Sequence, residues 1–201
     1  MSLYRGALRT YIERPEKHGG LIRFVDEKFV ILEDGFPKAK VHYLVMPRDK
    51  KITRLHPVEA LSKPEFYKEA EEYVEKAIEL ACKELREKTG CKHEQEYYEQ
   101  FLKIGVHSSP SMDNMHIHVM SKDMCSDRMK KALHYSSFTT KFFIPFEEAA
   151  NLPEDDERRD REGMEQFVKK ADLTCWKCDK NFKRSFASLK PHLMEECSRI
   201  Y

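Results

Sequence analysis

Two histidines alternate with apolar residues in the run His116-Ile117-His118-Val119, and this alternation constrains the chain more than any other feature. Because successive side chains of a β-strand point to opposite faces, the run predicts a strand with one apolar face and one imidazole face. The imidazole face is expected to hold Asn114, His116, His118 and Met120, and the core face Met115, Ile117 and Val119. Paired histidines on a strand fit a structural role, a metal site or phosphoryl and nucleotidyl transfer, and the pattern alone does not choose among them.

Composition sets the broad class of the protein. The 201 residues are 40% hydrophobic, which is enough for a core and excludes a fully disordered chain. The 36 basic and 35 acidic residues leave a net charge of +1, so the overall charge gives no argument for or against a nucleic-acid partner. No apolar run approaches the roughly 20 residues that span a bilayer, and the start lacks a secretory signal pattern. We therefore expect a soluble intracellular protein without a membrane partner.

The periodicity of apolar residues predicts an α+β fold with a mainly antiparallel sheet, flanking helices and a small C-terminal domain. Helices are expected over residues 3–14 and 62–88, the second capped by Ser62 and ended by Gly90. Strands are expected over residues 21–25, 29–33, 41–46, 98–106, 115–121 and 137–144. Residues 147–165 hold 9 acidic and 3 basic side chains, which predicts a boundary. We divide the chain into a domain over 1–146, an acidic linker and helix over 147–167, and a basic module over 168–201.

Three of the six cysteines lie after residue 174, where their spacing predicts a zinc finger rather than a disulfide framework. Cys175 and Cys178 are separated by two residues, and His192 follows after thirteen more. A unit this small with so few apolar groups needs a metal to stay folded. The sequence therefore predicts a structural zinc ion held by Cys175, Cys178 and His192.

The fourth zinc ligand can be Glu196 or Cys197. Glu196 lies four residues after His192, about 40° around a helix, whereas Cys197 lies five residues after it, about 140° around. We favour Glu196 because it shares the helix face of His192 and carboxylate oxygen is a permitted zinc ligand. The basic and polar side chains around the finger are expected to contact nucleic-acid phosphates, and they are Lys183, Arg184, Ser185 and Lys190.

Residues 107–120 resemble the signature of the histidine triad superfamily, in which histidines alternate with apolar residues around a central nucleophile. Residues 31–47 resemble the nucleotide-pocket segment of the same superfamily, with Asp34, a proline three residues later, and His42 before an apolar strand closed by Pro47. The register places Asn114 at the first triad position, His116 at the central position and His118 at the third. The first histidine is therefore replaced by Asn114, which changes the support of the nucleophile rather than the nucleophile itself.

The resemblance implies a nucleotidyl-transfer site that needs no metal for its chemistry. The neutral imidazole of His116 would attack the phosphorus of a nucleotide, and water would later hydrolyse the nucleotidyl-histidine intermediate. His118, Ser111 and the amides of residues 109–112 would stabilise negative charge on the phosphate, and His107 would contact or protonate the leaving group. The resemblance also implies a nucleotide pocket: Asp34 would bind the ribose hydroxyls and Lys38 a phosphate, with Phe36, His42 and Asn114 lining the pocket.

A histidine triad domain joined to a C-terminal zinc finger resembles the DNA-deadenylase branch of that superfamily, and residues 134–138 add a further similar segment. This resemblance implies a nuclear monomer that removes AMP from adenylylated DNA at nicks and double-strand ends, and GMP from guanylate-capped 3′ ends. The amphipathic N-terminal helix would lie against the DNA end, and Arg5, Lys38 and Lys122 would join the finger residues in binding DNA. Two alternatives stay open: a hydrolase of small dinucleotides or aminoacyl adenylates, and a nonenzymatic DNA-binding adaptor.

Overall fold

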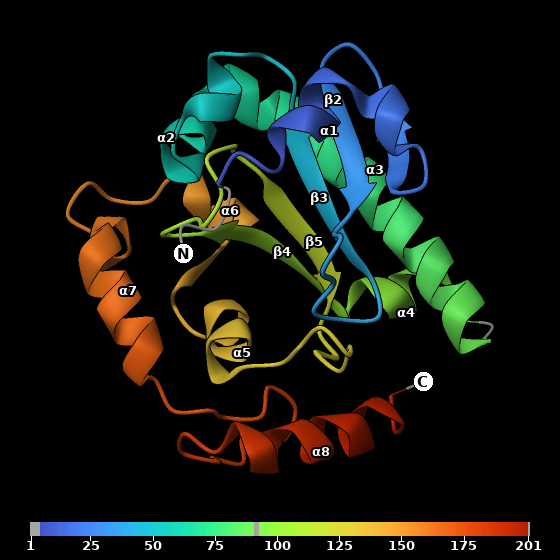
Figure 1. The fold of residues 1–201 in the computed structure, drawn as a ribbon, viewed down its shortest axis with the longest axis vertical. Coiled ribbons are helices and arrows are strands. Elements are labelled where there is room, and N and C mark those ends of the chain that lie inside the picture. The colour runs from blue at the N-terminus through green and yellow to red at the C-terminus, as the bar shows by residue number, and fades with distance from the viewer. Residues whose placement is uncertain (1–4, 91–92, 201) are drawn as a thin grey trace.

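A six-stranded sheet with the strand order β1-β2-β3-β5-β4-β6 forms the centre of the molecule (Figure 1). The computed structural model describes residues 5–90 and 93–200. Every neighbouring pair of strands is antiparallel. The strands are β1 (Ile22–Val25), β2 (Phe29–Glu33), β3 (His42–Pro47), β4 (Leu102–His107), β5 (Ile117–Ser121) and β6 (Phe143–Pro145). The predicted α+β class with an antiparallel sheet is confirmed.

Helices flank this sheet. The α-helices are α1 (Arg9–Glu13), α2 (Pro57–Leu61), α3 (Pro64–Thr89), α4 (Gln95–Glu99), α5 (Ala132–Thr139), α6 (Phe146–Ala149), α7 (Arg161–Lys170) and α8 (Phe186–Cys197). Three short 3₁₀ helices are η1 (Pro15–His18), η2 (Ile52–Arg54) and η3 (Glu157–Arg159). Within residues 5–90 and 93–200, none of these helices combines the length and the apolar character that crossing a bilayer requires.

The ends of two predicted helices need correction. The long helix α3 begins at Pro64 with Lys63 as its N-cap, and Ser62 instead forms the C-cap of α2. Its end is as predicted, because Gly90 has a φ of +68°, a left-handed conformation that glycine adopts without strain. The first helix is shorter than expected, since α1 starts at Arg9 after a turn, and residues 3 and 4 lie outside the described part.

The predicted strand over residues 137–144 is wrong. Its first half is the end of α5, and only Phe143–Pro145 pairs with β4. The hydroxyls of Thr139 and Thr140 donate to the carbonyls four residues earlier, at 2.9 and 2.8 Å. These bonds let threonines, which favour strands in general, complete the last turn of a helix.

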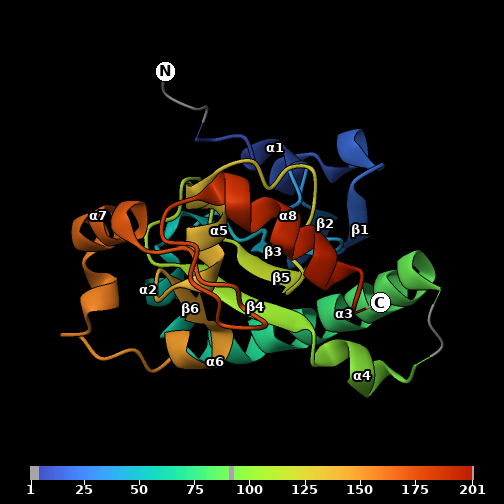
Figure 2. The ribbon, with the colours of Figure 1, turned by 90° about the horizontal axis from the view of Figure 1, so that it is seen from below.

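The two faces of the sheet are covered by different elements. One face packs against α3 through apolar side chains that include Ile117 and Val119, as the alternation predicts. On the other face, Leu8 and Ile12 from the α1 region cover Val30, Leu32 and Leu44. Figure 2 shows α1 and α3 on opposite sides of the sheet, with α8 near α5. The histidines lie at positions that neither of these two apolar clusters includes.

The C-terminal segment packs directly on the sheet domain. Leu173, Leu189 and Leu193 share one buried cluster with Tyr135 and Phe143. The hydroxyl of Tyr135 also donates to the carbonyl of Thr174 at 2.9 Å and accepts the N–H of Trp176 at 3.0 Å. The boundaries at 146 and 167 stay a prediction, but the finger and the sheet share a continuous apolar contact across them.

Gly105 provides a test of this packing. It lies opposite His118 on β5, and a Cβ atom there would come within 2.6 Å of Cε1 of Phe143 and meet the Ile144 carbonyl even more closely. We predict that Gly105→Ala lowers the free energy of unfolding by about 1–3 kcal/mol because the core is overpacked. Urea denaturation measures this change, and Gly20→Ala, where a Cβ meets nothing within 4 Å, is the matched control. Equal stability of the two variants would contradict the prediction.

Candidate functional site

Four imidazoles gather on one face of the sheet. His42 comes from β3 and His107 from the end of β4, His116 immediately precedes β5, and His118 lies at the start of β5. The ring centroid of His118 lies 4.6 Å from that of His107, 4.8 Å from that of His116 and 5.1 Å from that of His42. The antiparallel pairing of β3, β5 and β4 therefore brings together three chain segments that are far apart in the sequence.

The ring of His116 is oriented by the backbone. Its Nδ1 lies 2.7 Å from the carbonyl oxygen of Asn114, which can only accept a hydrogen bond. Nδ1 therefore carries the proton, and Nε2 carries the free lone pair. Burial is the main cause that lowers the pKa of His116 below the ordinary value of 6.5, so the ring is neutral at pH 7. A neutral imidazole with a free Nε2 is a competent nucleophile.

A chain of hydrogen bonds also fixes the tautomer of His118. The backbone N–H of Lys38 donates to Nδ1 of His42 at 3.2 Å, so the proton of neutral His42 is on Nε2. That Nε2 lies 2.9 Å from Nδ1 of His118 and donates to it. The proton of His118 is therefore on its own Nε2. Asp34 does not alter this assignment, since its oxygen is 3.6 Å from Nδ1 of His42, too far for a hydrogen bond.

Two of the four imidazoles have a buried nitrogen without a hydrogen-bond partner in the described part of the chain, as does the indole of Trp176 in the finger. Within the described residues, Nε2 of His118 and Nε2 of His107 are buried without a hydrogen-bond partner. Burial lowers the pKa of His42 to about 4 and that of His107 to about 3, and it holds the pKa of His118 well below 6.5. Leaving buried polar groups unpaired costs stability, so such groups in a native protein indicate a ligand or a catalytic role.

The loop before β3 supplies the other predicted pocket residues. Asp34 accepts the backbone N–H of Phe36 at 2.8 Å, and the Lys38 ammonium donates to the Phe36 carbonyl. Burial alone would raise the pKa of Asp34, but His42, Lys38 and the Phe36 amide hold it below its ordinary value. The Phe36 ring is 64% exposed and lies 5.5 Å from the Arg128 guanidinium. The loop therefore places a carboxylate, an ammonium and an open aromatic surface near the histidines.

Asn114 is placed differently from the prediction. Its side-chain amide donates to the hydroxyl of Thr53 at 3.2 Å rather than to a histidine. The support expected from its side chain comes instead from its backbone carbonyl, which any residue at this position can provide. This explains why the first triad position tolerates a residue other than histidine.

Two contacts around the histidines are not apparent from the apolar and histidine patterns used above. The ring of Phe138 from α5 lies 4.7 Å from that of His107 and 5.1 Å from that of His118, so it closes one side of the cluster. The hydroxyl of Ser109 donates to Glu165 of α7 at 2.6 Å, which ties the loop between β4 and β5 to the C-terminal segment. Residues 134–138, through the resemblance, gave a signal for Phe138, whereas nothing in the sequence indicated the contact of Ser109 with Glu165. The predicted site residue Ser111 lies exposed in the same loop.

A basic groove is lined in part by Asn114, whose carbonyl contacts His116. Its volume is about 1260 Å³, and Thr53 also lines it. Its basic lining residues are Arg5, Arg9, Arg48, Lys50 and Arg54. The acidic side chains there are Glu13, Glu27 and Asp113, and the last pairs with Arg5 at 2.7 Å. The cluster of basic residues over 48–54 in the sequence could have indicated this groove.

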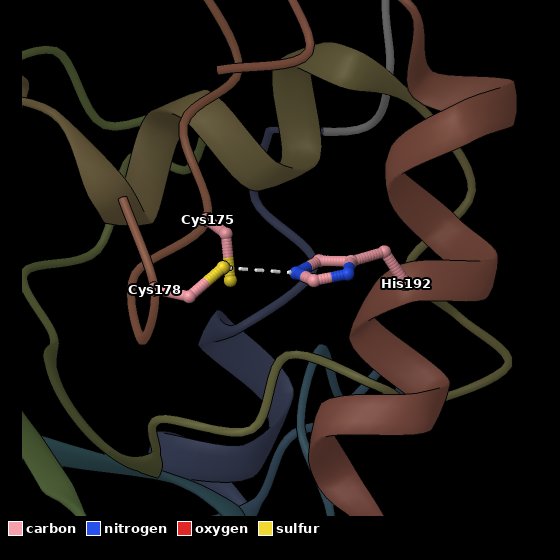
Figure 3. Close-up of side chains that lie close together, drawn as sticks. All are labelled: Cys175, Cys178 and His192. Atoms are coloured by element: carbon pink, nitrogen blue, oxygen red, sulfur yellow. Dashed lines mark hydrogen bonds between the residues drawn. The ribbon is translucent and has the colours of Figure 1, made fainter. Parts of the chain in front are cut away.

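The finger brings three of its predicted metal ligands together (Figure 3). The ligand atoms of Cys175, Cys178 and His192 all lie within 4.8 Å of one another. Sγ of Cys178 is 3.3 Å from Nε2 of His192. Sulfur and nitrogen ligands of a tetrahedral zinc ion are about 3.5 Å apart, so this donor set fits zinc.

The two candidates for the fourth ligand lie in different surroundings. Glu196 is buried one turn after His192, and its carboxylate pairs with Lys177 at 3.0 Å and Arg199 at 2.8 Å. Cys197 belongs to a separate buried group with Asp123 and Cys125. The packing therefore directs Cys197 toward Asp123 and Cys125. Among the described residues, Glu196 is not within the group formed by Cys175, Cys178 and His192, but its ion pair with Lys177 places it next to the Cys175–Cys178 turn.

Five of the seven predicted DNA-binding residues fall into two sets, while Arg5 lines the basic groove and Lys38 lies in the loop before β3. Lys183, Arg184 and Ser185 are exposed at the start of α8, where Ser185 is the N-cap. The other two lysines are engaged within the protein: Lys190 donates to the carbonyl of Ser126 at 2.5 Å, and Lys122 donates to that of Gln100 at 2.8 Å. The first set therefore presents free polar groups to solvent more readily than the second.

Comparison with known proteins covers nearly the whole chain. Residues 9–134 match the family model described as scavenger mRNA decapping enzyme C-term binding, and residues 139–199 match that of C2HE / C2H2 / C2HC zinc-binding fingers. An aprataxin-like protein of Saccharomyces cerevisiae is 35% identical over 208 residues, covering 94% of this chain and 94% of the relative. An aprataxin-like protein of Schizosaccharomyces pombe is also 35% identical, covering 96% of this chain and 81% of the relative.

Solved structures agree with the sequence relatives. The aprataxin ortholog Hnt3 in complex with DNA superposes with a TM-score of 0.86 at 33% identity, covering 98% of this chain and 96% of that one. Hnt3 in complex with DNA and guanosine gives a TM-score of 0.85 at 33% identity, covering 98% and 97%. The chain therefore belongs to the aprataxin-like family and combines a histidine triad fold with a C-terminal zinc finger.

Proposed function

We propose that the protein is a DNA 5′-adenylate hydrolase that reverses abortive ligation through a covalent His116–AMP intermediate. One observation carries this proposal: the free Nε2 of neutral His116 lies in a cluster that also holds two buried, unpartnered ring nitrogens, those of His118 and His107. A nucleophile and unused hydrogen-bonding groups in one place are what in-line transfer of a phosphoryl group requires. The DNA complexes of the homologous Hnt3 support DNA as the substrate.

The reaction has two balanced steps. In the first, Nε2 of His116 forms a bond to the AMP phosphorus as the bond to the oxygen of the DNA 5′-phosphate breaks. In the second, water attacks the same phosphorus, the P–N bond breaks, and AMP and neutral His116 are released. Nε2–H of His118 would donate to a nonbridging oxygen in both steps, and His107 would contact the leaving phosphate. Asp34 would accept hydrogen bonds from the ribose hydroxyls, and Lys38 would contact a phosphate.

Two basic surfaces would hold the DNA. The groove beside Asn114 carries five basic side chains, and the exposed residues Lys183 to Ser185 add a second surface on the finger. Phosphate contacts of this kind position a duplex without selecting its sequence. These surfaces favour DNA over the small dinucleotides or aminoacyl adenylates of the first alternative, and the intact nucleophile argues against a purely binding adaptor. We further propose that the protein acts as a monomer in the nucleus.

A second activity at the same site is the removal of guanylate from DNA 3′ ends. The observation that favours it is the homologous structure of Hnt3 with DNA and guanosine. The exposed Phe36 ring can stack on either purine, because stacking uses the flat face of a base rather than its edge. GMP would then be released by the same two steps at His116.

Zinc would support the finger without taking part in the reaction. Cys175, Cys178, His192 and Glu196 would hold it, and four protein ligands leave no position for a reacting water. When bound, the ion supplies folding energy to a small unit. Its loss would loosen the finger residues that share a cluster with Tyr135 and Phe143 next to the histidines.

The proposal is tested by AMP release from a nicked duplex with an adenylylated 5′ end. We predict that His116→Ala lowers the rate more than about 10³-fold, because the covalent route is lost. His93→Ala, which removes an exposed histidine next to Tyr97 instead, should retain normal activity.

Replacing Lys183 and Arg184 by alanine should reduce processing of the DNA substrate more than that of a small AMP conjugate. Equal losses on both substrates would favour the small-molecule hydrolase, and DNA binding without AMP release by the unaltered protein would favour the adaptor.

The buried histidines predict the pH dependence of the first step. The attack needs neutral His116, and its pKa is lowered from 6.5, so protonation sets in only at more acidic pH. We predict that kcat/KM for AMP release falls through protonation of His116 only below pH 6.5. The measurement is confined to pH values at which circular dichroism shows folded protein. An acidic limb centred at or above 6.5 would contradict the neutral, desolvated site.

The fourth zinc ligand can be tested with two neighbouring variants. We predict that Glu196→Ala weakens zinc binding by at least about 10- to 100-fold, because a ligand is lost. Cys197→Ala should leave zinc affinity unchanged, because its thiol lies in the group with Asp123 and Cys125. Competition with a chromogenic chelator measures both affinities, and the reverse order would identify Cys197 as the ligand.

We predict that Glu165 positions the loop between β4 and β5 through its hydrogen bond with Ser109. Glu165→Ala should lower kcat by about 10- to 100-fold with little change in KM, because the loop next to the reacting phosphate loses its anchor. Glu165→Gln keeps an acceptor oxygen and should recover most of the activity. Glu162→Ala, which removes another exposed carboxylate of the same helix, is the matched control. Failure of the glutamine variant to recover activity would contradict a role based on this hydrogen bond.

A further inference from the structure

A second group of cysteine side chains lies outside both the histidine cluster and the finger ligands. Cys125 follows β5, and Cys197 is the last residue of α8. The two Sγ atoms and a carboxylate oxygen of Asp123 all lie within 4.8 Å of one another. The three residues are 6%, 4% and 2% exposed, respectively, in the order Cys125, Cys197 and Asp123. The two cysteines are 72 positions apart in the sequence, and they lie where the finger helix meets the sheet domain.

The loop after β5 is built to present Cys125. One oxygen of Asp123 accepts the backbone N–H of Lys40 at 3.0 Å and that of Cys125 at 3.2 Å. The thiol of Cys125 lies 3.2 Å from the same oxygen. Met124, between them, has a φ of +50°, which is uncommon for a residue with a long side chain. These restraints hold the thiol of Cys125 toward the end of α8.

A metal ion is a poorer occupant of this group than a sulfur–sulfur bond. Among the described residues the group offers three donor atoms, whereas a closed structural zinc site uses four. The Asp123 oxygen already accepts hydrogen bonds, and the ammonium of Lys190 is held 2.5 Å from the carbonyl of Ser126, the next residue after Cys125. A buried cation would have to be added beside this positive charge.

We propose that Cys125 and Cys197 form a reversible disulfide when the protein meets a disulfide oxidant such as glutathione disulfide. One thiolate attacks a sulfur of glutathione disulfide and releases one glutathione. The second thiolate attacks the resulting mixed disulfide, forms the Cys125–Cys197 bond and releases the second glutathione. Two protons leave the protein, its two thiols are oxidised, and one glutathione disulfide is reduced. Opening of the last turn of α8, which ends at Cys197, gives the oxidant access.

The disulfide would fasten the end of α8 to the loop after β5. A bond that closes a long loop restricts the unfolded chain and therefore stabilises the folded state. It would also fix the finger helix relative to the histidine face, since Leu189 and Leu193 of the same helix already pack on the cluster with Phe143. The proposal does not depend on the reaction proposed above, because mass, zinc content and stability reveal it.

The test uses the full-length, zinc-loaded protein treated with glutathione disulfide, then with a thiol-alkylating reagent, and mapped by mass spectrometry without reduction. We expect a peptide pair joined through Cys125 and Cys197, with zinc retained. The thermal midpoint should rise by a few degrees relative to reduced protein. Cys125→Ser should lose both the joined peptides and the rise. Cys82→Ser, which removes a buried thiol from α3, should keep both.

Three outcomes would overturn the proposal. The first is alkylation of both Cys125 and Cys197 after oxidation of the folded protein. The second is a joined pair that contains Cys175 or Cys178 instead, accompanied by zinc release. The third is two zinc ions per chain in the reduced protein, falling to one in Cys125→Ser, which would make the group a metal site. The peptide map of the unaltered protein decides the question even if Cys125→Ser does not fold.

Discussion

The hydrogen bond between Nδ1 of His116 and the Asn114 carbonyl determines where the free lone pair of that ring lies. Because the acceptor is a backbone oxygen in the loop that leads into β5, the position of the lone pair follows from the course of the main chain. The second chain, from the Lys38 amide through His42 to His118, determines where a hydrogen-bond donor lies. Desolvation keeps all of these rings neutral. A single antiparallel arrangement thus places an imidazole with a free Nε2 beside an imidazole whose Nε2 carries the proton.

The sheet face that carries the histidines is enclosed from two sides. The α1 region covers β2 and β3, and α5 with the finger covers the side toward β6. Phe138 of α5 contacts the histidine cluster, and Glu165 of α7 contacts the loop between β4 and β5. The finger packs on the same buried cluster as Phe138 and Phe143, so it supports this side of the histidine site from behind.

Much of the fold follows from local patterns. The alternation over residues 115–119 predicts the two faces of β5, and Gly90 predicts the end of α3, because each depends on a residue and its close neighbours. Thr139 and Thr140 led to the wrong prediction of a strand, since their side-chain hydrogen bonds to helix carbonyls outweigh their preference for strands. Three further features depend on contacts between distant segments, which no local pattern contains. They are the hydrogen bond from Asn114 to Thr53, the hydrogen bond from Ser109 to Glu165, and the close approach of the Cys197 and Cys125 thiols.

The central claim is that one imidazole bonds to phosphorus during turnover. The most direct measurement is rapid acid-free quenching of the protein with adenylylated DNA, followed by proteolysis and mass spectrometry of the peptides. The account predicts one adenylyl group, located on His116, which forms and decays at rates that match AMP release. An adduct on any other residue, or AMP release at the normal rate with no adduct and with the His116 ring removed, would contradict it.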